Sequence, residues 1–321
     1  MNVSWPLPHV ARLDQRDGVR LLSQFAVLGD GRTLLVDAGL PETPERTTAP
    51  FLDEHDRRTD PVSLVITHLD ADHCGGTSTL QDLCPRVTVF AHAKECPPLG
   101  NPEAVIRERY AQFATSDDVR LGGEAYERIR RRLGDEFSVD VLVDGTCELI
   151  IGDEPCVIIH VPGHSAGHSA VWLPKDGTLI AGDAFMGAGI KTMDGHFLFP
   201  PQFIRPSLYL TSLWSVQKLH PDVLLCAHEK TMTGDEPEAF LETSRRMAEG
   251  IVETVAMSVR RGPKTLLQIC GDVRLSNDEW AELADGEFAP SVAGCLLEME
   301  DEGSVVVDHS AGVRHFEGSA R

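Results

Sequence analysis

A run of metal-binding residue types directly after a predicted strand limits what this chain can fold into more than any other feature. Residues 62–67 form an apolar, β-branched run, and the sequence H-L-D-A-D-H follows it, beginning at His68. In an extended backbone alternate side chains point to one side, so His68, Asp70 and Asp72 converge there. A turn then brings His73 beside them. The pattern H-x-D-x-D-H arises by chance in a chain of this length about once in several hundred sequences, so it predicts a metal site.

Three further candidate ligands follow other predicted strands. They are His164 in the turn P-G-H-S-A-G-H, Asp183 in A-G-D, and His228 in A-H-E. Loops after strand ends in α/β proteins commonly meet in one cleft, where such proteins place their binding and catalytic residues. We therefore expect these three side chains to join the four of the first motif in a single site.

The remaining pattern predicts an α/β chain with mixed sheets. Residues 21–37 form a hairpin around a Gly-Asp-Gly turn, with Asp37 at its end. Short apolar runs predict the further strands, and tight turns or helical segments separate them. These strands cover residues 62–66, 87–90, 147–151, 157–161, 170–173, 178–181 and 223–226.

Two segments have a helical composition. Residues 102–136 carry Glu, Arg and Tyr at helical spacing, so we expect an inserted helical hairpin over about 101–138. We interpret its basic run at 130–132 as a solvated helix face. After residue 235 the pattern is helical again, and a hairpin closes the chain. We therefore predict a catalytic domain over 1–235 and a winged-helix-like cap over 236–321.

The charge of the chain narrows the range of partners. The 321 residues include 29 Lys and Arg against 50 Asp and Glu, which gives a formal net charge of -21. A field of this sign repels phosphate backbones and anionic lipid, so we expect neither nucleic acid nor a membrane as a partner. No segment has the apolar length of a membrane span or of a signal peptide. We expect a cytoplasmic protein that acts on a small molecule, with its acidic cap serving in a homodimer or as a cover for the pocket.

In their order along the chain these motifs resemble the metallo-β-lactamase superfamily, over about residues 24–235. The resemblance begins with Asp37 in D-x-G and continues through the motif at 68–73 to the three later ligands. It implies a four-layer αββα sandwich with a cleft for two metal ions and a water or hydroxide between them. The implied ligands of one ion are His68, Asp70 and His164, those of the other are Asp72, His73 and His228, and Asp183 bridges the two.

One position departs from the family pattern, in which the first motif is H-x-H-x-D-H. Asp70 stands in the place of the second histidine. A carboxylate there adds a negative charge and a hard oxygen ligand, which raises the pKa of metal-bound water and makes iron or manganese more competitive. We expect two divalent ions, with zinc first and iron or manganese as the alternatives.

The resemblance implies a metal-dependent hydrolase. Two divalent ions generate hydroxide near neutral pH and polarise a lactone, ester or thioester carbonyl, and a protonated Asp72 is a candidate to assist the leaving oxygen. The stretch P-G-H-S-x-G-H resembles acyl-homoserine lactonases most, although those enzymes carry a tyrosine where this chain has Met186. The main alternative is a dinuclear iron oxidoreductase of the same fold, whose oxygen-handling branch also replaces that histidine by a carboxylate. A binding protein with a structural metal is the third alternative.

Further residues are expected around the ligands. Asp37 is expected to accept a hydrogen bond from the ligand loop or a ligand imidazole, and His168 to support the site without binding metal. Four residues are candidates for the substrate pocket, with surface or core positions as the alternative: His92, Phe185, Met186 and His196. The charge of the chain favours a neutral or weakly charged substrate, unless Lys191 or Arg205 forms a local basic pocket.

Overall fold

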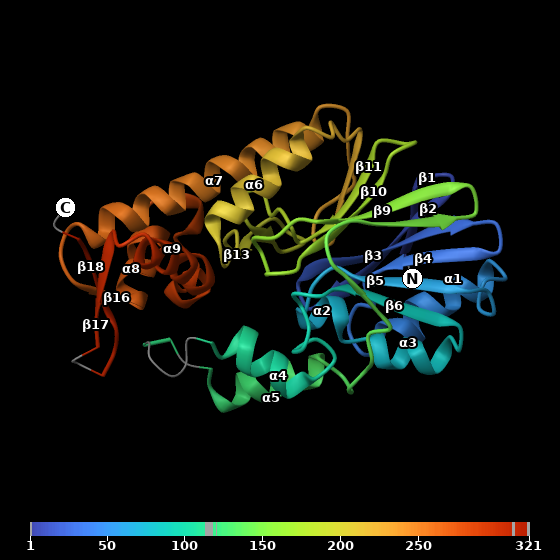
Figure 1. Ribbon diagram of the computed structural model, residues 1–321, viewed down its shortest axis with the longest axis horizontal. Helices are drawn as coiled ribbons and strands as arrows, with labels where there is room; N and C mark the ends of the chain where they lie inside the picture. The colour runs from blue at the N-terminus through green and yellow to red at the C-terminus, as the bar shows by residue number, and fades with distance from the viewer. Residues whose placement is uncertain (1, 113–117, 120, 310–311, 320–321) are drawn as a thin grey trace.

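The computed structural model describes residues 2–112, 118–119, 121–309 and 312–319. Two β-sheets face each other on the right of the view in Figure 1. The first sheet has seven strands in sequence order; β1 to β4 run antiparallel to one another, and β4 to β7 run parallel. These strands are β1 (Asn2–Leu7), β2 (Val10–Asp17), β3 (Arg20–Gly29), β4 (Arg32–Val36), β5 (Val62–Ile66), β6 (Val87–His92) and β7 (Val141–Val143).

The second sheet has six strands in the order β15-β14-β11-β10-β9-β8. All neighbours in it are antiparallel except β11 and β14, which are parallel. The strands are β8 (Cys147–Ile151), β9 (Glu154–His160), β10 (Ser169–Leu173), β11 (Thr178–Gly182), β14 (Val223–Cys226) and β15 (Met232–Thr233). Every strand that an apolar run predicted is present. The sequence did not predict β1 and β2, because charged residues and prolines interrupt any apolar run there.

The main core lies between the two sheets. Large apolar side chains from both sheets meet there, among them Phe25, Leu34, Ile158, Ile180 and Leu225. Alternate residues of a strand point to opposite faces, so the outer faces of these sheets also carry apolar side chains and need a helical cover.

Helices cover both outer faces (Figure 1). A helical turn, η1 (Pro44–Thr48), leads into α1 (Ala49–Glu54), which together with α3 (Thr77–Leu83) packs on the first sheet. The second sheet is covered by α6 (Pro206–Gln217) and α7 (Glu236–Val259). The predicted αββα sandwich is therefore confirmed.

A helical insert connects β6 to β7. It contains α4 (Pro102–Val105), η2 (Ile106–Tyr110) and α5 (Gly123–Arg132), and residues 113–117 and 120 of the predicted hairpin lie outside the described residues. The insert is seated against the loop after helix α2 (Ala71–Cys74). A Cβ at Gly75 would lie 2.1 Å from the backbone oxygen of Arg132, so only a glycine allows the two segments to approach this closely.

The C-terminal segment follows α7. Its helical elements are η3 (Asp278–Trp280), η4 (Asp285–Phe288), α8 (Leu266–Arg274) and α9 (Ala289–Asp301). A small sheet in the order β16-β18-β17 completes it, with β16 (Lys264–Thr265), β17 (Val305–Asp308) and β18 (His315–Gly318). The predicted terminal hairpin is present as β17 and β18. The winged-helix-like character of this segment and the domain boundary at residue 235 stay predictions.

Two short strands, β12 (Ile190–Lys191) and β13 (Phe197–Phe199), form a separate antiparallel pair. An isolated bridge from Arg20 to Thr192 connects this pair to the start of β3. Among the described residues, no helix combines the length and the apolar character that crossing a membrane requires.

Candidate metal centre

The first motif lies at the end of β5. The backbone stays extended through Asp70, which has φ -69° and ψ 145°, and helix α2 then begins at Ala71. Asp72 therefore projects from a helical turn, whereas the sequence predicted extended backbone there. Successive residues of a helix point about 100° apart, so Asp72 and His73 can both reach the same site from neighbouring positions.

The seven predicted ligands come together at one place. Six of them form two groups, and within each group the candidate ligand atoms lie within 4.8 Å of one another. The first group is His68, His164 and Asp183; the second is Asp72, His73 and His228. Asp183 lies between the groups, since its Oδ2 is 3.3 Å from His73 Nε2 and 3.2 Å from His228 Nε2. Asp70 Oδ2 is 3.2 Å from His164 Nε2. The side chains of four separate loops thus surround one small volume.

The imidazole rings are oriented as metal binding requires. The Nε2 atoms of His68, His73 and His228 are buried and have no hydrogen-bond partner among the described residues. On the opposite side of two of these rings, His73 Nδ1 lies 2.7 Å from Asp37 Oδ2 and His228 Nδ1 lies 2.7 Å from the carbonyl oxygen of Leu21. An Nδ1–H that donates to such an oxygen leaves the lone pair on Nε2, which is the form that binds a metal. The residues present therefore fit divalent cations.

Asp37 connects the end of β4 to the ligand loop. Its Oδ1 accepts the backbone N–H of Thr67 at 2.7 Å, and its Oδ2 accepts the Thr67 hydroxyl at 2.9 Å. The same Oδ2 faces His73 Nδ1. One buried carboxylate thus fixes the start of the loop and the orientation of a ligand imidazole.

Glu95 holds two of the ligand loops together, a role that no sequence pattern indicated. Its carboxylate accepts the backbone N–H of Leu69 at 3.0 Å, the hydroxyl of Ser165 at 2.7 Å and the backbone N–H of Gly167 at 2.6 Å. Burial raises the pKa of the Glu95 carboxyl, and the bonds from Ser165 and Gly167 oppose that shift. A single glutamate in a loop carries no sequence signal of such contacts.

Asp70 also has a partner that the sequence did not reveal. Nε and Nη2 of Arg109 donate to Oδ1 and Oδ2 of Asp70, each at 2.8 Å, and Nη1 donates to the carbonyl oxygen of His164 at 3.0 Å. The side chains of Arg109 and Asp70 are 8% and 14% exposed. Burial opposes the charged form of Asp70, but the Arg109 guanidinium holds the pKa of this carboxyl well below its usual range. Asp70 is therefore a carboxylate shared between the ligand cluster and the insert.

Comparison with known proteins places this site in a family. Residues 19–228, more than half of the chain, match the family model of the metallo-beta-lactamase superfamily. The chain belongs to the metallo-β-lactamase superfamily. The predicted resemblance is therefore confirmed, and with it the coarse assignment to the metal-dependent hydrolases of this superfamily.

Individual members of the superfamily resemble the chain over most of its length. A hydroxyacylglutathione hydrolase of Shewanella sp. (strain ANA-3) is 25% identical over 224 residues, which cover 70% of this chain and 69% of that protein. A probable metallo-hydrolase of Bacillus subtilis (strain 168) is 24% identical over 268 residues, with 77% and 78% coverage. A solved metallo-beta-lactamase family protein from Thermus thermophilus has a TM-score of 0.76 at 20% identity, over 98% of this chain and 99% of that one. The C-terminal segment thus belongs to the shared fold.

A cavity of about 600 Å³ opens over the candidate ligands. Asp70, Asp72, His164 and Asp183 belong to its lining. Residues of the β2–β3 turn, of the β12–β13 pair, of the insert and of the C-terminal segment also line it. Met186 also lines it, so one predicted pocket residue lies at this cavity.

The other predicted pocket residues lie elsewhere in the fold. Phe185 is buried in the core beneath the second sheet's helices. His92 stacks on a neighbouring histidine ring with centroids 3.9 Å apart, and His196 borders a separate surface depression. His168 is buried beside the ligands, where its ring stacks on His68 at 4.7 Å. A position after a strand does not determine where the side chain points, and Phe185, His92 and His196 lie outside the lining of this cavity.

A row of ion pairs connects the ligands to the insert. Arg20 Nη2 lies 2.6 Å from Asp72 Oδ2 and 2.7 Å from Asp17 Oδ2, and Arg132 Nη1 lies 2.6 Å from Asp17 Oδ1. Burial opposes the charged form of Asp72, but Arg20 holds the pKa of this carboxyl below its usual range. Asp72 is therefore ionised at neutral pH, which argues against the proton-donating role that the sequence suggested. Of the basic run at 130–132, Arg131 is exposed, as a solvated helix face predicts, whereas Arg132 is half-buried and lines the cavity.

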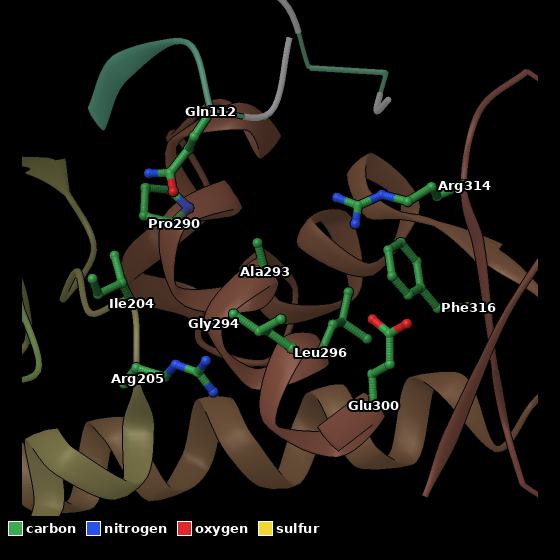
Figure 2. A pocket seen from close by; sticks show the side chains of 11 residues that line it. Gln112, Ile204, Arg205, Pro290, Ala293, Gly294, Leu296, Glu300, Arg314 and Phe316 are labelled. Atoms are coloured by element: carbon green, nitrogen blue, oxygen red, sulfur yellow. The ribbon is translucent and has the colours of Figure 1, made fainter. Parts of the chain in front are cut away.

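A second cavity of about 250 Å³ adjoins the first, and Gln112 and Pro290 line both. Figure 2 shows its lining, in which Leu296 of α9 and Phe316 of β18 are apolar and Arg205 carries a charge.

Proposed function

We propose that the chain hydrolyses a thioester of a small molecule, with oxygen esters and lactones as weaker substrates, at a dinuclear metal centre. The observation that carries this proposal is the convergence of the buried Nε2 atoms of His68, His73 and His228 on the carboxylates of Asp72 and Asp183. Two divalent ions bound there would supply a hydroxide near neutral pH and polarise the substrate carbonyl.

We assign the ligands to two metal positions around a shared carboxylate. One position takes His68, Asp70 and His164, the other takes Asp72, His73 and His228, and Asp183 serves both. Zinc is the metal we expect, with iron or manganese as the alternatives because Asp70 adds an oxygen ligand.

The other residues of the site act by orientation and charge. Asp37 keeps the Nε2 of His73 directed at the centre through its contact with Nδ1. Arg20 and Arg109 offset the negative charges of Asp72 and Asp70, which would otherwise repel one another and a bound hydroxide. The insert and the C-terminal segment surround the cavity and restrict water around the reacting carbonyl.

Two observations favour a thioester over a lactone. The curated relatives of this chain include several hydroxyacylglutathione hydrolases, and that name describes the cleavage of a thioester. Met186 stands where the resembling lactonases have a tyrosine, and it is buried at 4% exposure with no O–H to donate. The thiolate that leaves a thioester is a better leaving group than the alkoxide that leaves a lactone. Thioester cleavage therefore has less need of a tyrosine O–H to protonate the leaving group.

A substrate panel with metal removal and replacement tests this function. The full chain, loaded with zinc, manganese or iron(II), is expected to hydrolyse simple thioesters faster than the matching esters and lactones. Activity should be lost after dialysis against a chelator and should return with metal. His228→Ala should abolish turnover, whereas His196→Ala, a histidine on an exposed turn, should not. Turnover that survives both the chelator and His228→Ala would contradict the proposal.

A dinuclear iron oxidoreductase is the second candidate, and the carboxylate of Asp70 beside His164 is the observation that favours it. Iron in such a site gives a coloured protein whose absorbance changes on reduction. A colourless protein that hydrolyses thioesters with zinc would exclude this candidate.

A further inference from the structure

The cavity over the metal centre has a charge that the whole chain does not suggest. Its lining side chains carry nearly equal charge of both signs, with four arginines against five acidic residues. The arginines are Arg20, Arg109, Arg128 and Arg132, and the acidic residues are Asp17, Asp70, Asp72, Asp183 and Glu287. Each bound divalent ion would add two positive charges. The loaded cavity is then positive inside a chain of net charge -21, and charges at such short range outweigh the screened field of the distant surface.

Three of the four cavity arginines have carboxylate partners. Arg109 binds Asp70, and Arg20 and Arg132 both bind Asp17. The fourth is different: within the described parts of the chain, Arg128 has no ion-pair partner. It projects from α5 at an exposed position and still lines the cavity.

Glu287, in η4 of the C-terminal segment, lines the same cavity. Burial raises the pKa of the Glu287 carboxyl, and the charge of Arg128 opposes this shift without a direct contact. Arg128 and Glu287 line the same cavity from two different segments, and no carboxylate of the described residues forms an ion pair with the guanidinium, so it is available to an anion that enters the cavity.

We propose, on the basis of the proposed function, that the substrate carries a carboxylate and that Arg128 binds this group away from the reacting carbonyl. A guanidinium offers two parallel N–H donors that match the two oxygens of a carboxylate. Arg128 and the metal ligands line one continuous cavity, so a single substrate can reach both. The sequence had suggested Lys191 or Arg205 for such a role. Arg205 is instead paired with Asp301, and Lys191 lies over the ring of Phe197 outside this cavity.

Two matched pairs of thioesters test this inference on the metal-loaded full chain. The first pair is the butyryl and succinyl thioesters of N-acetylcysteamine, which differ by a carboxylate on the acyl side. The second is the acetyl thioesters of propanethiol and 3-mercaptopropionate, which differ by a carboxylate on the thiol side. We expect kcat/KM to favour the anionic member of at least one pair.

Variants on helix α5 identify the residue. Arg128→Ala should lower the preference for the anionic member by about tenfold to a hundredfold, mostly through KM, and Arg128→Lys should keep part of it. Arg131→Ala is the matched control, because Arg131 is an exposed residue of the same helix that does not line the cavity. It removes the same charge and should leave the preference intact.

The two ways in which the experiment can fail are distinct. Equal hydrolysis of both members of both pairs, or an equal loss of preference in Arg131→Ala and Arg128→Ala, would overturn the role of Arg128. Absence of hydrolysis with every thioester would instead count against the proposed function itself.

Discussion

Arg109 binds both carboxylate oxygens of Asp70, and through this pair the helical insert reaches the ligand cluster. The substitution of a carboxylate for a histidine in the first motif is thus accompanied by a cation. Taken together, Asp70 and Arg109 are neutral, as a neutral imidazole would be. The shift in metal preference that the sequence predicted from the added negative charge should therefore be smaller than that charge alone implies.

Removal of Arg109 should destabilise the protein in a way that metal reverses. Arg109→Ala leaves the Asp70 carboxylate buried without its counter-charge, so we expect the free energy of unfolding to fall by about 3 kcal/mol without added metal. Zinc should restore part of this loss, because the cation then takes over as the partner of Asp70. Urea denaturation with and without zinc measures both values.

The control for this experiment is Arg107→Ala. Arg107 belongs to the same helical turn, η2, and its side chain is 68% exposed in a pair with Glu108. It should change stability little. An equal loss in both variants, or a loss in Arg109→Ala that zinc does not alter, would show that the pair is unrelated to the metal centre.

Glu95 should control metal affinity although it touches no metal position. Glu95→Gln replaces an acceptor oxygen by an NH₂ group, so at least one of the donors from Leu69, Ser165 and Gly167 loses its partner. Because both ligand loops then loosen, we expect zinc to bind about tenfold to a hundredfold more weakly, with the fold retained. Competition with a chromophoric chelator measures this affinity, and circular dichroism checks the fold. Glu54→Gln, at an exposed position, is the control, and an affinity equal to that of the control would refute the role.

Asp17 should make stability fall at low pH. Burial raises the pKa of its carboxyl, but Arg132 and Arg20 together lower it below the ordinary value. A carboxyl with a lowered pKa in the folded state contributes its full stabilisation above its unfolded pKa of about 4. This stabilisation is lost as the pH falls through the folded pKa. Asp17→Asn should therefore flatten the acid side of the stability profile below about pH 4, as measured by thermal unfolding at a series of pH values. Asp30→Asn, which removes an exposed carboxyl, is the control. If the stability of Asp17→Asn falls at low pH as steeply as that of the wild type and of Asp30→Asn, the role of Asp17 is contradicted.

Gly75→Ala should displace the insert. The added Cβ would lie 2.1 Å from the backbone oxygen of Arg132, which cannot move aside as a flexible side chain could. We expect a loss of about 1 to 3 kcal/mol in the free energy of unfolding. Gly122→Ala has open space around its Cβ and serves as the control. Hydrogen exchange of α5 reports the displacement directly, and unchanged protection there would contradict the proposed close contact.

The sequence predicted the sandwich and the ligand cluster because both depend on local patterns. The apolar runs determine strands such as β5 and β14, and the ligands follow these strands directly, so the positions of His68 and His228 follow from neighbouring residues. The helical start at Ala71 was missed, because a four-residue helix has no periodicity to detect.

Contacts between distant segments could not be predicted in the same way. Glu95 and Arg109 reach the ligand loops from 26 and 39 residues away, and each is one charged residue among many in the sequence. The direction of a side chain past a strand end could not be predicted either, so the sequence could not decide between pocket and surface positions for His92 and His196. The basic run of α5 has a helical pattern, but the face that lines the cavity depends on how the insert is seated.

The central claim is that the chain binds two metal ions at one site, and the zinc content of the zinc-saturated chain tests it most directly. The full chain is saturated with zinc, desalted and analysed for metal and protein, in parallel with His164→Ala and His228→Ala. We predict two zinc ions per chain in the wild type and one in each variant, because each histidine belongs to a different group of ligands. A wild-type chain that retains no zinc, or variants that retain as much as the wild type, would contradict the account.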